Sequence, residues 1–354
     1  MNRKVILMGT DTVSGIAPEI IDYLIHASKT KTLPYGNDVY TRECKKIICK
    51  IFEKDNLEII PMMSGTASNA LALSSFLPSY GSILCHEESH INKDEGGAPE
   101  FFSGGGKLLT MSDISGKLKS ININTKIDNL NFKGRKTPKL TGVSITQLAE
   151  NGTIYKKDEI LEISKICKIN NMFLHMDGAR FANALAFQNI SPAEATWKLG
   201  VDCLSLGATK NGAMAAEVII FFNTRLAEEA KNKIKQTGHV ISKTRFISAQ
   251  LNAWFKNELW LKLATSANNK AKYLSEHISL FKGFELLYPT EGNEVFLKIE
   301  NKVYDKILKL DIIPNLWSKV SDNELVIRLV TSFETEINEI NELLERLTSQ
   351  FEKN

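Results

Sequence analysis

The sequence has 354 residues, enough to bury a substantial core and to form a large domain together with a smaller one. Its 44 basic and 41 acidic residues leave a formal net charge of only +3, and no basic stripe is interleaved with aromatic residues, which argues against a nucleic-acid partner. No run of about 18 consecutive apolar residues occurs, so we expect no membrane span.

The amino terminus and the cysteines indicate a cytoplasmic protein. The first apolar run ends at Asp11, too early for the apolar segment of a signal peptide. The five cysteines are odd in number and lack the spacing of a zinc site or a disulfide framework. We therefore predict a protein of the reducing cytoplasm that binds no metal.

Hydrophobic patterning predicts an α/β fold. Between about residues 56 and 238, short apolar runs alternate with amphipathic stretches, as expected for a sheet with helices on its faces. Residues 158–169 predict a helix that leads into a buried strand at 172–177, with a break at Asn170 and Asn171. From about Arg245 the pattern becomes long, charged and helical, which predicts a second, smaller domain.

The first candidate site element lies at Ser64, Gly65 and Thr66, where an apolar strand ends and a helix begins. Free backbone N–H groups at a helix start, with hydroxyl groups beside them, form an anion site suited to a phosphate. An ordinary Ser or Thr N-cap explains the same residues equally well.

The second element is the segment MDGAR, in which Asp177 ends an apolar strand and Arg180 follows three residues later. Ligands of open α/β sheets collect at the carboxyl ends of strands, which places both side chains at a predicted pocket. A surface ion pair is the simpler interpretation of these two residues alone.

The third element is Lys210, which lies in the small-residue loop of SLGATKNGA. A lysine among Gly, Ala and Thr has room around its ammonium group and can act as a nucleophile when it is desolvated. A loop lysine without a role is the alternative. Together, however, a phosphate site, a carboxylate and a lysine in this order are what a pyridoxal phosphate (PLP) enzyme needs, with the lysine forming a Schiff base.

The chain resembles the threonine aldolase family of fold type I PLP enzymes, whose fold is that of aspartate aminotransferase. The resemblance runs from residue 10 almost to the carboxyl terminus and implies a large domain with a mixed, mostly parallel sheet flanked by helices, plus a smaller C-terminal α+β domain. Six motifs carry it: YGNDVYT (35–41), SGTASNALAL (64–73), SHINKDEGGAPE (89–100), NGTIY (151–155), LHMDGARFANAL (174–185) and SLGATKNGA (205–213).

The resemblance implies roles for the residues around the cofactor. Lys210 would form the Schiff base with PLP, and Asp177 would bond the pyridinium nitrogen. Arg180 would lie beside the 3-oxygen of PLP or the substrate carboxylate. The phosphate would be held by the N-terminal turn formed by Ser64, Gly65 and Thr66.

Other residues are implied around the substrate. His90 would stack on the pyridine ring near the substrate hydroxyl, where it either removes the hydroxyl proton or only stacks. Arg328 would bind the α-carboxylate, and Tyr40 would approach the site of a neighbouring subunit. Arg245 matches a family position, whereas Phe246 replaces a glutamine that many members carry, and Thr10 replaces a serine.

The resemblance also implies domain limits and an assembly. We expect an N-terminal arm at residues 1–14, a large PLP-binding domain at 15–244 and a small domain at 245–354. A homodimer or homotetramer with active sites at the dimer interface is expected.

The predicted function is PLP-dependent cleavage of L-threonine, L-allo-threonine or related β-hydroxy-α-amino acids to glycine and an aldehyde. A PLP-dependent β-eliminating lyase or racemase that acts on a small amino acid is the alternative, since fold does not fix function. A relative without catalytic activity is disfavoured by the joint presence of Lys210, Asp177 and Arg180.

Overall fold

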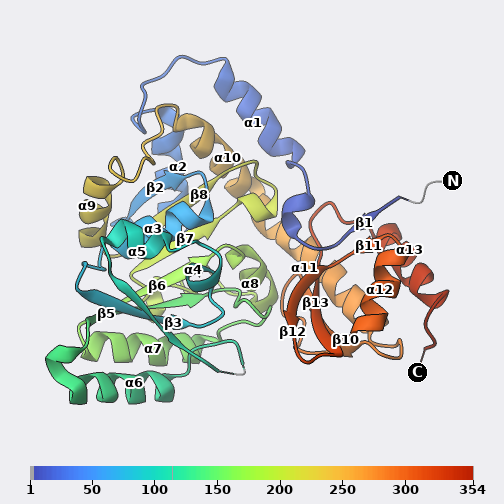
Figure 1. Cartoon of the computed structure of the whole chain (residues 1–354). Helices are drawn as coiled ribbons and strands as arrows, with labels where there is room; N and C mark the ends of the chain where they lie inside the picture. Colours follow the sequence, from blue (N-terminus) through green and yellow to red (C-terminus); the bar gives the residue numbers. More distant parts are fainter. Residues whose placement is uncertain (1–3, 114, 354) are drawn as a thin grey trace.

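The computed structural model describes residues 4–113 and 115–353. Figure 1 shows two lobes, a large one that contains the central sheet and a small one at the carboxyl-terminal end, with the long helix α11 (Leu259–Ile278) running from one to the other. The predicted N-terminal arm begins with residues 1–3, which lie outside the described residues.

The large lobe is built on a seven-stranded sheet in the order β2-β8-β7-β6-β5-β3-β4. Six strands run parallel, and β8 is antiparallel to both of its neighbours. The strands are β2 (Glu58–Met62), β3 (Gly81–His86), β4 (Lys107–Met111), β5 (Lys139–Thr146), β6 (Phe173–Gly178), β7 (Cys203–Gly207) and β8 (Glu217–Phe221).

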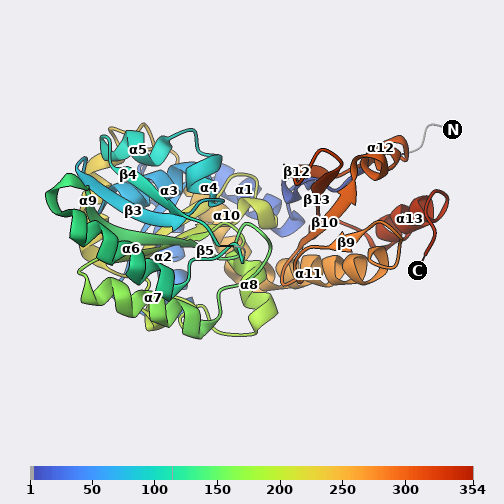
Figure 2. The same cartoon turned by 60° about the horizontal axis from the view of Figure 1, so that its bottom comes forward.

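Helices cover both faces of this sheet, so apolar side chains from alternate strand positions are buried on each side (Figure 2). One face is covered by α3 (Gly65–Ser74), α4 (His90–Lys93), α5 (Ala98–Ser103) and α9 (Thr224–Lys233). The other face is covered by α1 (Pro18–Ser28), α2 (Val39–Ile51), α6 (Ser120–Lys133), α7 (Lys157–Ile169), α8 (Phe181–Gln188) and α10 (Arg245–Phe255).

The small lobe contains a four-stranded antiparallel sheet in the order β12-β13-β10-β9 and a parallel pair of β1 with β11. Its strands are β1 (Ile6–Leu7), β9 (Glu285–Leu286), β10 (Glu294–Glu300), β11 (Ile312–Ile313), β12 (Asn315–Lys319) and β13 (Glu324–Val330). Its helices are α12 (Asn301–Lys309) and α13 (Ile337–Thr348), which pack with the second half of α11 in a separate hydrophobic core.

The structure confirms the predicted α/β fold with a smaller α+β domain. The predicted helix and strand around Asn170 are α7 and β6, with Asn171 in a left-handed conformation at the break. The first half of α11 packs in the core of the large lobe, and its second half packs in the core of the small lobe. The boundary between the two cores therefore lies within α11, later along the chain than the predicted boundary at Arg245. The reason is that α10 packs on α1 and α2 of the large lobe.

Among the described residues, no helix combines the length and hydrophobicity needed to cross a membrane.

Candidate active site

The predicted cofactor residues meet at the carboxyl edge of the large sheet. Asp177 lies near the end of β6, Lys210 follows β7, and the turn at Ser64 follows β2. All three strands are parallel, so their carboxyl ends lie along one edge of the sheet. The side chains line one cavity of about 200 Å³.

Asp177 is buried and held from two sides. The side-chain amide of Asn69 on α3 donates to Asp177 Oδ2 at 2.8 Å, and the backbone N–H of Ala179 donates to Oδ1 at 3.0 Å. The two hydrogen bonds fix the orientation of the carboxyl group. An ionised carboxylate held at the cavity wall can keep a ring nitrogen protonated.

The loop that carries Lys210 is fixed by residues of α10 and α11. Asn211 Nδ2 donates to the Trp260 carbonyl at 2.9 Å, and Trp254 Nε1 donates to the Asn211 carbonyl at 2.9 Å. Gly212 then reverses the chain at φ +100°, and a Cβ there would lie 2.8 Å from Leu263. These contacts fix the path of the backbone that carries Lys210 to the cavity.

The start of α3 fits a phosphate. Gly65 and Thr66 are the first residues of the helix, whose leading N–H groups have no intrahelical acceptor. A Cβ at Gly65 would meet no atom within 4 Å, so open space lies beside its backbone. Ser64 also caps the helix by accepting from the backbone N–H of Ala67 at 3.3 Å, so the N-cap interpretation holds as well.

His90 belongs to a buried chain of hydrogen bonds that reaches Asp177. Its Nδ1 lies 3.0 Å from Glu95 Oε1, and the same oxygen accepts from Asn69 Nδ2 at 2.8 Å. The hydrogen bond with Glu95 raises the pKa of His90 above its ordinary value, and burial raises the pKa of Glu95. His90 is thus fixed in orientation at the cavity by a carboxylate.

Two further carboxyl groups line the cavity, and the sequence analysis did not single them out. Glu217 is the first residue of β8, which reaches the carboxyl edge because this strand is antiparallel to its neighbours. Glu150 lies in the turn after β5. Burial raises the pKa of each to about 7, and Asp177 contributes to both shifts.

Arg180 is buried in ion pairs with carboxylates of the same chain. Its Nε donates to Asp11 Oδ2 at 2.8 Å, and a terminal nitrogen lies 3.3 Å from Glu294 Oε1. Burial alone would raise the pKa of Asp11, but Arg180 and Lys210 lower it below its ordinary value. Arg180 lines the cavity, as predicted, although much of its guanidinium group is already paired.

Arg328 lines an adjoining outer cavity of about 530 Å³ between the lobes. It contacts Glu294 Oε1 at 3.0 Å and its guanidinium lies 4.8 Å from the ring centre of Trp317. Its buried Nε has no hydrogen-bond partner among the described residues. A carboxylate that enters the outer cavity would meet the Arg328 side chain at its wall.

Tyr40 and Arg245 are not among the described residues that line either cavity. Tyr40 is buried in a small cluster with Phe246, and its hydroxyl lies 3.3 Å from Thr30 Oγ1. The Arg245 guanidinium stacks over the Phe246 ring at 4.8 Å. Their roles toward a substrate, which for Tyr40 involve a second subunit, stay predictions.

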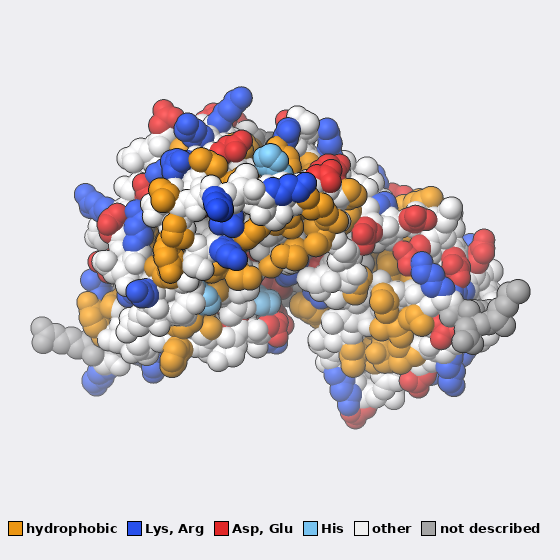
Figure 3. Space-filling model, turned by 90° about the horizontal axis from the view of Figure 1, so that it is seen from above, with side chains coloured by type: hydrophobic (Ala, Val, Ile, Leu, Met, Phe, Trp, Pro, Cys, Tyr) orange, Lys and Arg blue, Asp and Glu red, His pale blue; other side chains and the backbone are white. Residues whose placement is uncertain are grey.

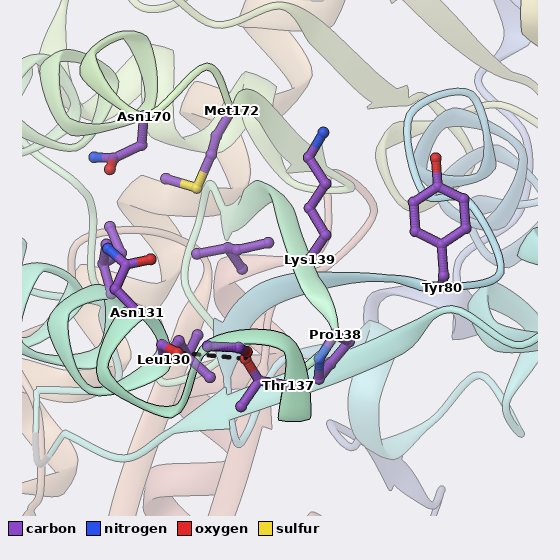
Figure 4. Close-up of a pocket in the computed structure, with 11 residues that line it drawn as sticks. Tyr80, Leu130, Asn131, Thr137, Pro138, Lys139, Asn170 and Met172 are labelled. Carbon is purple, nitrogen blue, oxygen red and sulfur yellow. Dashed lines mark hydrogen bonds between the residues drawn. The ribbon is translucent and has the colours of Figure 1, made fainter.

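A larger hollow of about 600 Å³ lies elsewhere, beside the end of α6 and the amino end of β5 (Figure 4). Its wall includes Tyr80, Asn131, Asn170 and Met172, and among the described residues that line it Lys139 is the one charged side chain. It sits at the opposite edge of the sheet from Lys210, and its described lining residues include no carboxyl or imidazole group.

A fold type I architecture, with a lysine, a buried aspartate and a helix N-terminus around one cavity, defines a PLP enzyme. Residues 8–302 match the beta-eliminating lyase family. The chain is 42% identical over 301 residues to the low specificity L-threonine aldolase of Pseudomonas sp. (strain NCIMB 10558), covering 84% of this chain and 85% of the relative.

Further relatives agree. The Pseudomonas aeruginosa low specificity L-threonine aldolase is 40% identical with the same coverage of both chains. The solved Leishmania major threonine aldolase superposes with a TM-score of 0.91 at 27% identity, covering 97% of this chain and 99% of that one. The chain therefore belongs to the beta-eliminating lyase family and, within it, to the threonine aldolases, which confirms the predicted family, enzyme class and PLP cofactor.

Proposed function

We propose that this protein cleaves L-threonine, L-allo-threonine and related β-hydroxy-α-amino acids to glycine and an aldehyde. The observation that carries the proposal is the meeting of Lys210, Asp177 and the start of α3 at one cavity. The low-specificity L-threonine aldolases to which the chain is similar support the choice of substrate.

Bound PLP would supply an electron sink for the pair released when the Cα–Cβ bond breaks. Lys210 would hold the cofactor covalently, and the N–H groups of Gly65 and Thr66 would bind its phosphate beside Ser64. Asp177, held in place by hydrogen bonds from Asn69 and Ala179, would hold a proton at the ring nitrogen. His90, oriented by Glu95, would contact the ring face.

The substrate carboxylate would bind Arg328, which lines the outer cavity next to Lys210 and Arg180. Arg180 would lie beside the cofactor, since its ion pairs with Asp11 and Glu294 hold its guanidinium group in place there. A carboxylate between the lobes would draw them together around the reacting bonds and exclude water.

The test is a substrate panel. Pure protein with PLP is supplied with both enantiomers of threonine, allo-threonine and phenylserine, and glycine and aldehyde are quantified. We expect release from the L-amino acids, and loss of both activity and the visible absorbance band in Lys210→Ala. Absence of glycine from every substrate contradicts the proposal.

A second candidate is β-elimination, because the family to which the chain belongs is named for that reaction. Pyruvate and ammonia formed from serine or cysteine in the same panel, without glycine from threonine, would support it. Conversion of one enantiomer of a small amino acid into the other would support a racemase.

The assembly we propose is a homodimer or homotetramer with its active sites near a subunit interface. Figure 3 shows hydrophobic side chains gathered on one face of the large lobe, beside the notch between the lobes. Exposed apolar residues flank the site in the chain, among them Met63 next to Ser64 and Met214 after Lys210. Exposed apolar surface of this kind is typical of subunit contacts. Sedimentation velocity measures the assembly, and a monomer at every concentration contradicts it.

The compartment we propose is the reducing cytoplasm. All five cysteines are free in the structure, and four are buried, which is consistent with thiols that are never paired.

A further inference from the structure

Glu150 stands at the junction of the two cavities. It lines both the inner cavity, with Asp177, and the outer one, with Arg328. Lys210, His90 and Arg180 also line both, so Glu150 is the one carboxyl group of the described residues that shares this junction with them. A substrate held between Arg328 and Lys210 passes next to its side chain.

The turn that carries Glu150 is rigid. The backbone N–H of Ala149 donates to the Thr153 carbonyl at 2.9 Å, and that of Gly152 donates back to the Ala149 carbonyl at 2.8 Å. Asn151 Nδ2 donates to the Ser115 carbonyl at 2.7 Å. These hydrogen bonds hold the backbone next to Glu150, and a catalytic group is best placed on a backbone that is held in this way.

One oxygen of Glu150 is fixed and the other is free. Oε1 accepts from the backbone N–H of His90 at 3.2 Å. Oε2 makes no hydrogen bond with any of the described residues, and Glu150 lies at the cavity walls, so this oxygen can meet a ligand. The contact with His90 places Glu150 beside the residue that the sequence assigns to the substrate hydroxyl.

The charges that face Glu150 leave it able both to accept and to donate a proton near neutral pH. Burial and Asp177 raise its pKa, whereas Lys210 and His90 lower it, and Glu294 raises it further, with a net value of about 7. General acid–base catalysis is most effective when the pKa of the group lies near the working pH.

His90 is less suited to accept a proton. Glu95 holds its Nδ1 at 3.0 Å and raises its pKa, so a larger share of the imidazole is cationic than for a free histidine. A cationic imidazole has no lone pair with which to take a hydroxyl proton. Its bond to Glu95 instead fixes the ring for stacking.

We propose that Glu150 is the catalytic base that takes the proton from the β-hydroxyl of the substrate, an inference that rests on the proposed aldol cleavage. The ionised carboxylate accepts the hydroxyl proton, and the O–H electron pair becomes the second bond of the new carbonyl. The Cα–Cβ bond breaks and leaves its pair on Cα, which then takes up one proton. The products are glycine and an aldehyde, and Glu150 returns its proton to solvent through the outer cavity.

The test compares two reactions of one variant. Glu150→Gln keeps the size of the side chain and an oxygen that can accept from His90, but it cannot take a proton. We expect kcat for L-threonine cleavage to fall by about 10²- to 10⁴-fold. Exchange of the α-proton of glycine with D2O, followed by NMR, needs no hydroxyl proton transfer and should persist within a few-fold of the wild-type rate.

The pH profile gives a second readout. Because Glu150 must be ionised to act, wild-type kcat/KM should fall as the pH decreases through about 7. Glu150→Gln should lose this limb. Glu150→Asp retains a carboxylate on a shorter arm and should recover part of the activity together with the limb.

Glu58→Gln is the matched control. Glu58 is a partly buried carboxylate on β2 that pairs with Lys45 at 2.8 Å and lines neither cavity. Its substitution should leave both reactions unchanged.

The outcomes separate the inference from the function it rests on. Normal threonine cleavage by Glu150→Gln overturns the inference and leaves the aldolase function intact. Equal loss of cleavage and glycine exchange, with the visible PLP band retained, also overturns it, because Glu150 would then act on cofactor or substrate geometry. Absence of cleavage in the wild-type enzyme overturns both.

Discussion

Asn69 and Asp177 are joined by a buried 2.8 Å hydrogen bond in which the asparagine amide donates to Asp177 Oδ2. The same nitrogen donates to Glu95 Oε1, so one amide group separates two carboxylates that would otherwise repel each other. We expect Asn69→Ala to reduce kcat by about 10- to 100-fold, as is typical when a group that orients a catalytic residue is lost.

Steady-state kinetics with L-threonine measure this effect, and PLP titration shows whether the cofactor still binds. Asn69→Asp should be more damaging, because it adds a third carboxylate to the cluster. Asn131→Ala, on the exposed face of α6, is the control. Unchanged kcat in Asn69→Ala would show that Asp177 does not depend on this bond.

Trp317 supports Arg328 through a stacking contact of 4.8 Å. We expect Trp317→Ala to raise KM for L-threonine, since a cation–π contact contributes about 0.5–2 kcal/mol, or roughly 2- to 30-fold. Because Arg328 would bind a part of the substrate that does not react, kcat should change less. Trp317→Phe should recover most of the affinity, and equal KM values for wild type and Trp317→Ala would contradict this role.

Gly207 makes room for the carboxyl group of Glu217. A Cβ at this position would lie 2.7 Å from Glu217 Oε2 and 2.9 Å from the backbone of Ala179. We expect Gly207→Ala to lower the free energy of unfolding by about 1–3 kcal/mol through overpacking. Urea denaturation checks this, with Gly9→Ala as control, where the new Cβ would meet its nearest atom at an ordinary 3.4 Å.

His175 should make stability depend on pH. It lies buried between Ser144 Oγ at 2.9 Å and Ser205 Oγ at 3.0 Å, and burial lowers its pKa to about 4. The unfolded chain, with a pKa of about 6.5, binds a proton that the native protein does not bind between pH 4 and 6.5. His175 therefore decreases stability as the pH falls through this window.

The decrease in the free energy of unfolding that His175 causes should reach about 3 kcal/mol by pH 4. Urea denaturation at a series of pH values should show a smaller loss for His175→Gln than for wild type. His26→Gln, at an exposed position of α1, should follow the wild-type curve. Parallel curves for wild type and His175→Gln would contradict the prediction.

The alternation of strands and helices was readable from the sequence because each buried strand is a short apolar run. The direction of β8 was not, since EVIIFF has the same pattern whether the strand runs parallel or antiparallel. That direction brings Glu217 to the active edge, so its place in the site was hidden too. The helical pattern at Arg245 likewise gave no sign that α10 packs with the large lobe.

The meeting of Asp177 and Lys210 at one cavity was predictable from the motifs that carry them, whereas their cofactor roles stay predictions. The residues that support them were not predictable, because the contacts join distant parts of the chain. Asn69 lies 108 positions from Asp177, and Asp11 lies 169 positions from Arg180. One signal in the sequence could have indicated Glu217. This acidic residue directly precedes an apolar run, and a carboxyl group next to a buried strand is unusual unless it has a role.

The N-terminal segment belongs to both lobes. Ile6 and Leu7 pair with β11 of the small lobe, while Asp11 forms its ion pair with Arg180 of the large lobe. Fewer than five residues separate these two attachments, so the chain between them can extend only a short distance. The segment acts as a short tether, and the small lobe can swing away from the cavity only as far as the tether allows without releasing Arg180. Opening of the site for substrate and the ion pair between Arg180 and Asp11 are therefore mechanically coupled.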